Sequence, residues 1–503
     1  MGRHVFAGRL TKRPEHISRC VKTLVPRLGL VLFALALVAA SPPAPQRATQ
    51  ETELEKVTRQ AVKWLSEYVK INTTNPPGGE LPAARYLRQI LQREGIACRT
   101  VVSEPGRANF MARIAGRNRH GGVALVHHMD VVPVASGSWT VPPFSGLVRD
   151  GYVWGRGALD SKGLGVVHLA AIVALKRSGR IPERDVILLA VADEETGGRA
   201  GMKWIVEEQE DWLRDIEYAL TEGGANIVRD DRLAYVGLEN TQKLAVWLRL
   251  TAGGEPSHGS YLNREAASHR LVRALDRLLR YQPGIVITPA VSRYLHDIAA
   301  FQAPETRERF LHLEELRKDP DAVRRFDPVY QALLRNTIAV TVISAGNATN
   351  SLSGTALAEV DCRLVPTQDP HEFIETVIDI VGDSNVVVEP VLITSSPSSP
   401  LGGELFEAIR TVTHSIDRQA VVGSAVLAGF TDARFLRERD IVVYGFDPFK
   451  ASNGNLLRIH GTDERVAISD LEFAIHYLSA VVSELAFSPH RATQPNGVTL
   501  THP

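Results

Sequence analysis

Residues 123–133 read VALVHHMDVVP, and this stretch guides the interpretation of the whole chain. Four apolar residues run directly into two histidines and an aspartate. Because side chains alternate along a strand, His128 and Asp130 point the same way. A metal-bound imidazole usually donates its second N–H to a carboxylate. The stretch therefore suggests a metal ligand, His128, oriented by Asp130, although an ordinary polar strand end is the better explanation when the stretch is taken alone.

Short apolar runs alternate with helical patterns on both sides of this stretch. Apolar residues recur at the helical period upstream and again directly downstream, and the runs between them have the length of buried strands. Strands that alternate with helices predict an α/β fold with parallel strand pairs. The expected helices are 51–70, 81–94 and 161–176, and the expected strands are 122–127, 185–192 and 217–220.

The pattern changes after residue 238 and returns after residue 400. In between, strands (243–251, 337–344, 355–364), helices (264–280, 370–381) and a charged stretch (293–335) indicate an α+β unit. Helices at 404–415 and 468–485 and a strand at 441–445 then restore the α/β pattern. We therefore predict one catalytic domain with a mixed, largely parallel sheet, formed by 46–242 and 396–487, that is interrupted by an inserted α+β lid domain, 243–395.

Charge is balanced overall but uneven along the chain. The formal net charge is zero, which argues against a nucleic-acid partner. Residues 1–40 hold seven Lys/Arg against one acid and end in the apolar run LGLVLFALALVAA. Thirteen apolar residues are fewer than the about 20 that span a bilayer. The pattern predicts a secretory signal peptide, 1–40, and a secreted or periplasmic protein. The alternative is an uncleaved membrane anchor. Residues 488–503 are polar and predicted to be disordered.

Cysteine gives little information about function. Cys20 lies in the predicted signal peptide, which leaves Cys98 and Cys362. Both lie within strand-like apolar patterns, so we expect two separate buried thiols rather than a disulfide.

A second motif, GRGALDSKG at residues 155–163, places Asp160 where a helix begins. The glycines allow a tight backbone path before it. An aspartate at this position is often a helix N-cap, which is the ordinary alternative. A metal-ligand role becomes preferable because other candidate ligands follow neighbouring strands.

A third motif, DEETGG at residues 193–198, follows the strand 185–192 directly. Successive acids at the end of a buried strand are costly unless a cation is present. Because adjacent residues face opposite sides, one glutamate can bind metal while the other acts on the substrate water. We assign Glu195 to the metal and Glu194 to the role of general base. A solvated acidic turn is the alternative.

Two further motifs complete a set of five candidate ligands. Glu222 follows a strand in LTEGG, residues 220–224, and His460 begins HGTDER, residues 460–465. Open α/β sheets place their sites at the carboxyl ends of strands. Two divalent ions that share a carboxylate would activate a water and polarise a carbonyl. Nitrogen and carboxylate ligands suit Zn²⁺, with Co²⁺ or Mn²⁺ as alternatives.

In this order along the chain, the motifs resemble those of the M20 family of metallopeptidases. The resemblance covers about residues 55–485 and includes Trp139 and PPFSG at 142–146. It implies a zinc-peptidase-type fold whose lid domain also serves dimerisation. It further implies that Asp160 bridges two zinc ions, with one site completed by His128 and Glu222 and the other by Glu195 and His460.

The resemblance also implies roles for residues of the lid. His258, in GEPSHGS at 254–260, would stabilise the oxyanion, and in relatives this histidine can reach the active site of a partner subunit. Asn350 and Arg363 resemble lid residues that contact a substrate carboxylate. Arg434, in TDAR at 431–434, is a weaker candidate for substrate contact. Two departures from the family, ENTQ at 239–242 and the extra residues at 293–335, are expected to alter the pocket rim.

These observations predict a dinuclear zinc hydrolase that cuts a peptide or N-acyl amide bond next to a free carboxylate, as a carboxypeptidase or dipeptidase does. The alternative is an N-acyl-amino-acid deacylase, which needs the same metals. A non-catalytic binding protein would have lost a ligand or the base, and all six residues are present. The expected partners are a small peptide or N-acyl amino acid and, through the lid, a second copy of the chain.

Overall fold

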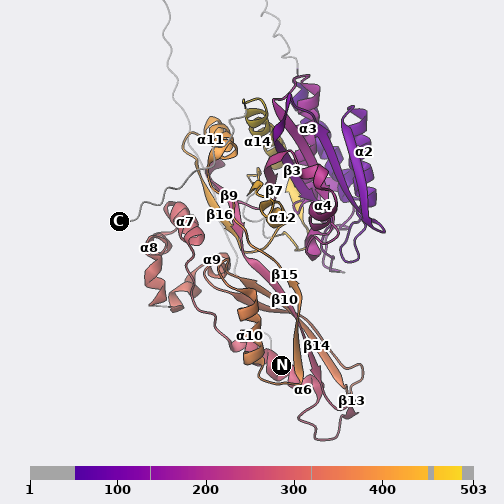
Figure 1. Ribbon diagram of the computed structural model, residues 1–503, viewed down its shortest axis with the longest axis vertical. Helices are drawn as coiled ribbons and strands as arrows, with labels where there is room; N and C mark the ends of the chain where they lie inside the picture. The colour runs from indigo at the N-terminus through magenta and orange to yellow at the C-terminus, as the bar shows by residue number, and fades with distance from the viewer. Residues whose placement is uncertain (1–50, 136, 319, 451–457, 490–503) are drawn as a thin grey trace, which may run out of the picture. The chain divides into compact units, whose positions relative to one another are not determined.

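The computed structural model describes residues 51–135, 137–318, 320–450 and 458–489 (Figure 1). The predicted signal peptide, 1–40, and nearly all of the predicted tail, 488–503, lie outside these residues. Within the described ranges, no helix has both the length and the apolar character needed to cross a membrane.

The largest element of the described chain is a nine-stranded mixed sheet. Its central strands β6, β3, β7 and β17 are parallel, and so is the outer pair β9–β16, while β1, β2 and β8 pair antiparallel. This confirms the predicted α/β fold. The strand order is β1 (Ala97–Glu104), β2 (Arg107–Ile114), β6 (Arg184–Val191), β3 (Asn118–His128), β7 (Ile216–Thr221), β17 (Val442–Gly445), β9 (Arg232–Gln242) and β16 (Val421–Leu427), with β8 (Ala225–Arg229) beside β9.

Helices cover both faces of this sheet (Figure 1). Val123 and Leu125 of β3 pack into one apolar cluster, whereas Ala124 and Val126 pack into another on the opposite face. Burial on both faces explains why the strand reads as a continuous apolar run. The first cluster includes α1 (Glu53–Val69), α2 (Leu81–Arg93), α3 (Lys162–Arg177), α11 (Gly403–Ile416) and α14 (Ile468–Ala486), and the second includes α4 (Met202–Glu208), α5 (Glu210–Leu213) and α12 (Ala433–Arg437).

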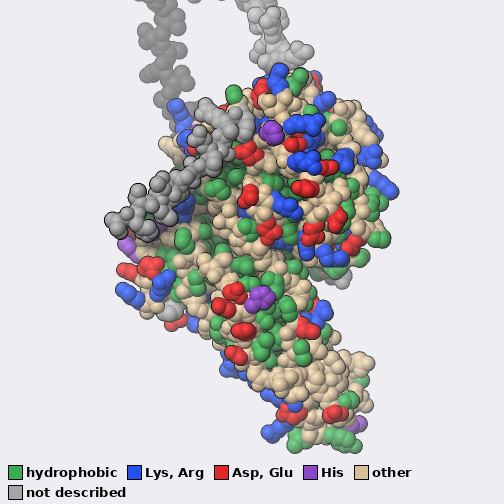
Figure 2. Space-filling model, viewed as in Figure 1, with side chains coloured by type: hydrophobic (Ala, Val, Ile, Leu, Met, Phe, Trp, Pro, Cys, Tyr) green, Lys and Arg blue, Asp and Glu red, His purple; other side chains and the backbone are tan. Residues whose placement is uncertain are grey.

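A second sheet lies within residues 244–393, where four described strands pair antiparallel in the order β12–β14–β10–β15. Alternate residues of β14 are buried against two helices, as its apolar–polar alternation predicts. Hydrophobic side chains also gather on the exposed surface over β10 and β15 (Figure 2), and Val387 and Val391 are among those exposed. The elements are β10 (Leu244–Gly253), β12 (Thr337–Ala345), β14 (Thr355–Leu364), β15 (Val386–Ile393), α6 (Ala267–Arg280) and α10 (Pro370–Val381).

Two small sheets complete the described strands. One joins β11 (Ser257–His258) to β13 (Ser351–Leu352), and the other joins β18 (Arg465–Ala467), β5 (Tyr152–Trp154) and β4 (Leu147–Arg149).

The charged stretch 293–335 is helical and has its own apolar core. α7 (Pro289–Ile298), α8 (Pro304–Leu311) and α9 (Pro328–Leu333) bury their apolar residues against β9 and the edge strand β16. Asp297 accepts hydrogen bonds from the backbone N–H and the hydroxyl of Ser424 in β16, at 3.2 and 3.1 Å. The stretch therefore covers the outer edge of the large sheet. The domain boundaries 46–242, 243–395 and 396–487 stay predictions.

The two described cysteines are free, as expected, but only one of them is buried as expected. Cys362 is buried and Cys98 is half-buried.

The fully buried His168 of α3 has no hydrogen-bond partner for Nδ1 among the described residues. Its ring centroid lies 5.8 Å from that of His127. Burial lowers the pKa of His168 to about 3, so the folded protein keeps this imidazole neutral.

The substitution His168→Gln is expected to flatten the acid dependence of stability. Unfolded His168 takes up a proton below a pKa of about 6.5, and folded His168 takes one up only near 3, so this residue adds stability above pH 6.5 that is lost as the pH falls. Between pH 7 and 5 the loss is about 2 kcal/mol. Melting temperatures at both pH values measure it, with the exposed His371→Gln as control. Equal acid dependence in wild type and His168→Gln would contradict the argument.

Candidate metal centre

The five predicted ligands meet at one edge of the large sheet. His128 ends β3, Glu222 follows β7, Glu195 lies in the short 3₁₀ helix after β6, and Asp160 precedes α3. His460 approaches from the segment before β18. The carboxyl ends of parallel strands meet at the same edge, which explains why residues far apart in sequence converge here.

Asp160 lies at the middle of the cluster. Its Oδ1 is 2.8 Å from Nε2 of His128, which is also 3.1 Å from Oε2 of Glu222. Its Oδ2 is 3.1 Å from Nε2 of His460, which is also 3.3 Å from Oε2 of Glu195. The two carboxylate oxygens of Asp160 thus face two different histidine–glutamate pairs. These are the pairs that the family resemblance implies.

Glu194 adds a fourth carboxylate to the cluster. Single ligand atoms of His128, Glu194 and Glu222 lie within 4.8 Å of one another, as do those of His128, Asp160 and Glu195. Oε1 of Glu194 and Oε1 of Glu195 are buried and have no hydrogen-bond partner among the described residues. Buried carboxylate oxygens without a partner are costly unless a cation is present.

The pKa values of the clustered carboxyl groups reflect the same excess of negative charge. Burial and the charge of Glu222 hold the pKa of Glu194 well above its usual range. Burial and the charge of Asp160 raise the pKa of Glu195 to about 7. Burial opposes ionisation of Asp160, but hydrogen bonds from His128 and His460 outweigh it and lower its pKa. A set of four carboxylates and two imidazoles at this spacing fits divalent cations.

Asp130 holds three of these groups in place. Its backbone carbonyl lies 2.9 Å from Nδ1 of His128, and its Oδ1 lies 3.5 Å from the same atom. The closer contact to the imidazole is therefore the carbonyl, although the sequence analysis expected the carboxylate. The carboxylate instead accepts the backbone N–H groups of Glu194 and Glu195, each at 3.2 Å. One residue thus positions a predicted ligand of each metal and the predicted base.

Further positioning residues escaped the sequence analysis. Asn75 donates from Nδ2 to the carboxylates of Asp130 and Asp193, at 2.8 and 3.1 Å. Glu464 accepts the backbone N–H of Asp160 at 3.2 Å and pairs with Arg156 at 2.6 Å. Glu464 lies within the motif HGTDER, and Arg156 lies within the motif GRGALDSKG. Their places beside two predicted ligands could have indicated a role at the site.

Arg156 also contacts the segment that carries the second histidine. It donates to the backbone carbonyls of His460 and Gly461, at 3.2 and 2.8 Å. The Arg156–Glu464 pair therefore joins the backbone of the bridging aspartate to the backbone of His460.

Glycine shapes the turn after Glu222. Gly224 has a φ of +101°, and a Cβ atom there would lie 2.8 Å from the carbonyl oxygen of Gly237. Only glycine fits this conformation and this spacing, which explains the acid–glycine–glycine pattern.

The cluster opens into a cavity of about 690 Å³. All residues of the cluster except His128 line it, together with Arg363 and a majority of apolar side chains. The lining side chains outside the cluster are Val132, Leu159, Leu164, Ala225, Asn226, Trp247, Val329, Arg363, Leu427, Phe430, Thr431, Asp447, Phe449 and Ile459.

Of the four predicted substrate and oxyanion residues, only Arg363 lines this cavity. His258 and Asn350 are exposed and lie together, since Gly259 donates its N–H to the carbonyl of Asn350 at 2.8 Å. Arg434 is buried behind the wall and donates to the carbonyls of Thr431 and Gly197. Its guanidinium lies over the rings of Phe430 and Phe435. The structure thus gives Arg434 a supporting place in the wall, and its contact with substrate stays a prediction.

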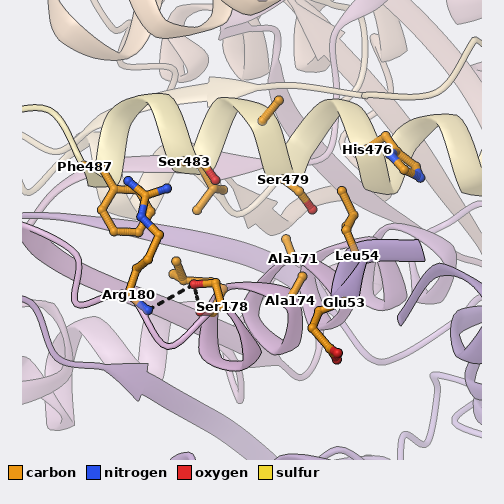
Figure 3. A pocket seen from close by; sticks show the side chains of 13 residues that line it. Glu53, Leu54, Ala171, Ala174, Ser178, Arg180, His476, Ser479, Ser483 and Phe487 are labelled. Carbon is orange, nitrogen blue, oxygen red and sulfur yellow. Dashed lines mark hydrogen bonds between the residues drawn. The ribbon is translucent and has the colours of Figure 1, made fainter. Parts of the chain in front are cut away.

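A second cavity, of about 580 Å³, lies between α3, α14 and the start of α1 (Figure 3). Small side chains such as Ala171 and Ser479 line much of it, and Arg180 lies over the ring of Phe487 at one end. None of the predicted site residues lines this cavity. It is therefore separate from the cluster of carboxylates and histidines.

Curated proteins of similar sequence include hydrolases of more than one kind. The N-fatty-acyl-amino acid synthase/hydrolase PM20D1 of Xenopus tropicalis is 29% identical over 362 residues, which cover 70% of each chain. Aminoacylase-1 of Sus scrofa is 26% identical over 440 residues, which cover 85% of this chain and 96% of the relative.

Solved structures share the fold. The crystal structure of human carnosine dipeptidase 1 superposes with a TM-score of 0.67 at 15% identity and covers 87% of this chain and 99% of that chain. A sequence model described as peptidase family M20/M25/M40 matches residues 124–484, about seven tenths of the chain. The resemblance drawn from the motifs is confirmed, and the chain is a hydrolase that belongs to peptidase family M20/M25/M40.

Proposed function

We propose that this enzyme hydrolyses a peptide or N-acyl amide bond next to a free carboxylate, with two divalent cations bound at the cluster. The observation that carries the proposal is the position of Asp160. Its two oxygens face separate histidine–glutamate pairs. Glu194 lies beside them in the wall of a cavity that also holds Arg363. The arrangement combines a bridging carboxylate, a base and an anchor for an anion.

The residues that would hold the cations are His128, Asp160, Glu195, Glu222 and His460. Their nitrogen and oxygen donors favour zinc, with cobalt and manganese as alternatives. Bound divalent ions would supply an activated water at neutral pH and a polarised substrate carbonyl.

The chain itself supplies the movement of the proton. Glu194 takes a proton from the attacking water and delivers it to the nitrogen of the leaving amine, which is the task of a general base and then of a general acid. Its backbone N–H is held by Asp130, and Asp130 is held in turn by Asn75. These hydrogen bonds therefore fix the backbone that carries the base.

His258 is proposed to stabilise the oxyanion from a second copy of the chain. It is exposed on β11 and does not line the cavity of its own chain. A dimer formed through residues 243–395 would bring the histidine of one copy toward the cluster of the other. An oxyanion donor of this kind contributes about 3 kcal/mol.

Arg363 is proposed to bind the substrate carboxylate. Asp361 fixes its guanidinium through Nε and Nη2, at 2.7 and 2.9 Å. Its third nitrogen, Nη1, is buried and has no partner among the described residues. A fixed guanidinium with a free N–H is suited to a carboxylate.

The substitution Arg363→Lys is expected to raise KM about tenfold or more and to leave kcat within about twofold. A lysine keeps the charge but loses the planar fork. Initial rates over a range of substrate concentrations separate the two constants. Arg249→Lys is the matched control because Arg249 makes an ion pair with Glu359 on the same sheet. A fall in kcat with KM unchanged would argue against carboxylate binding.

Two substrate classes fit the site, and each class is favoured by some of the relatives. The name of the structural neighbour, a dipeptidase, favours peptides, whereas aminoacylase-1 and the fatty-acyl-amino acid hydrolase favour N-acyl amino acids. Product release from a panel of dipeptides and N-acyl amino acids, with and without chelator, tests the proposal. Hydrolysis that survives complete removal of metal would refute it.

Export from the cytoplasm is proposed from residues 1–40, with a secreted or periplasmic location and a membrane anchor as the alternative. The N-terminal sequence of the mature protein tests this. A soluble cytosolic protein that begins at Met1 would refute export.

A further inference from the structure

The cavity wall beside Arg363 is apolar. The guanidinium of Arg363 lies 4.7 Å from the ring centroid of Phe430, and that ring lies 5.8 Å from the ring of Trp247. Trp247 pairs with Asp361 across β10 and β14, so Trp247, Asp361 and Arg363 share one face of the lid sheet. This is the face away from α6 and α10, because Val246 and Cys362, the alternate residues, pack against those helices.

The helix α9, within the extra residues 293–335, contributes Val329 to the same cavity. Leu427 lines it as well, and hydrogen bonds of Lys243 link the segment of Leu427 to the end of α9. The backbone N–H of Lys243 donates to the carbonyl of Leu427 at 3.0 Å. Its Nζ donates to the carbonyls of Ala332 and Arg335, at 2.7 and 2.8 Å.

The backbone of Val329 is held in place, although the residue is 55% exposed. Its backbone N–H is capped by Asp327 at 2.9 Å. The next residue, Tyr330, packs edge-on against Phe310, with centroids 5.1 Å apart. Leu333 at the end of α9 is buried. An exposed apolar side chain on a well-anchored helix, facing a cavity, is placed to meet an apolar ligand.

Charge is distributed unevenly around the cavity. The lining carboxylates belong to the metal cluster and to Asp447, which follows β17. The apolar part of the wall carries no charge, and Arg363 is the cation beside it. This part consists of Trp247, Val329, Leu427 and Phe430. A group bound between Arg363 and this wall therefore meets the ion pair of Arg363 with Asp361 on one side and apolar side chains on the other.

We propose that Val329, Trp247, Leu427 and Phe430 form a specificity pocket for the residue that bears the substrate carboxylate. The pocket selects amides of amino acids with large apolar side chains, such as leucine, over those of glycine. This inference rests on the proposed function of the same site. It also gives the extra residues 293–335 a role in substrate choice, because they supply the wall at Val329.

The test compares hydrolysis of N-acetyl-leucine and N-acetyl-glycine by the zinc-loaded full chain. Wild type is expected to prefer N-acetyl-leucine in kcat/KM. The substitution Val329→Asp is expected to lower that preference about tenfold, mainly through the leucine substrate, because a buried apolar group contributes roughly ten- to two-hundredfold to discrimination. Val329→Ile is expected to retain the preference.

Val102→Asp is the matched control. Val102 is 51% exposed and lies on β1, at the opposite edge of the large sheet from β16. An unchanged preference in Val329→Asp, an equal change in Val102→Asp, or a wild-type preference for N-acetyl-glycine would each overturn the inference.

Binding separates this inference from the proposed hydrolysis. Calorimetric titration of both N-acetyl amino acids into zinc-loaded Glu194→Gln is expected to show tighter binding of N-acetyl-leucine, and the difference is expected to shrink when Val329→Asp is added. Selective binding without hydrolysis by the wild type would refute the proposed function and support the pocket. Hydrolysis by the wild type, together with equal binding of both compounds, would support the proposed function and refute the pocket.

Discussion

Replacing Glu194 by glutamine is expected to lower kcat by about 10³-fold while two divalent ions stay bound. An amide of nearly the same shape keeps the packing but cannot take a proton from water, and general base catalysis contributes roughly 10²–10⁴-fold. Glu194 lies at the cluster, and its Oε1 lacks a protein partner among the described residues. Because Glu194 is not one of the five predicted ligands, metal content and substrate KM are expected to change little.

Metal analysis of the purified variant and steady-state rates measure both parts of this result. Glu208→Gln on the exposed surface of α4 is the control for loss of a nearby glutamate charge. Full activity in Glu194→Gln with both metals bound would end its assignment as the base. Loss of metal together with loss of activity would instead assign Glu194 to the ligands.

Replacing Asp160 by asparagine is expected to have the largest effect of any single substitution. Both oxygens of Asp160 face a histidine of the cluster, so a neutral amide weakens both predicted metal positions together. Metal content is expected to fall from two ions per chain to one or none. Activity is expected to fall on the order of 10⁴-fold, since the activated water and the polarised carbonyl are lost together.

Metal analysis after dialysis and the rate at saturating zinc check this prediction. The control is Asp150→Asn, because Asp150 is exposed and has a positive φ of 54°, which asparagine tolerates. Full recovery of activity with excess zinc would show that Asp160 only tunes affinity. Two tightly bound ions in Asp160→Asn would contradict its bridging role.

The sequence carried enough information to bring most of the cluster together. Apolar runs that end in acids mark the carboxyl ends of strands, and parallel strands bring those ends to one edge. His128, Glu195 and Glu222 all follow this rule. His460 does not, because it precedes a short strand of another sheet, and its place followed from the family resemblance.

The positioning residues had no such pattern. Asn75 and Glu464 act through hydrogen bonds to groups far away in sequence, at separations of 55 and 304 residues for Asp130 and the Asp160 N–H. Neither residue belongs to a sequence pattern with the period of a helix or a strand. Such contacts depend on how whole elements pack, which local patterns do not encode.

The composition of β15 and β2 explains why the sequence analysis did not predict these two strands. β15 contains Glu389 and Pro390 and forms an edge of the lid sheet, where a proline is tolerated. β2 buries Arg107 and Asn109, which the hydrogen bonds to Glu80 and the carbonyl of Ala200 satisfy. Polar residues of this kind hide a strand from any search for apolar runs. His258 and Asn350 do not line the cavity, and the roles that the family resemblance implies for them stay predictions.

The helices that cover β16 have a consequence for the solubility of the protein. An uncovered edge strand presents free backbone groups that pair readily with other chains. Here the carboxylate of Asp297 caps the N–H of Ser424, and α7 packs over the strand. Deleting residues 293–335 would expose this edge together with the apolar side chains beneath it. A shortened enzyme would therefore aggregate through β16, so the segment cannot be trimmed for engineering unless the edge is covered in another way.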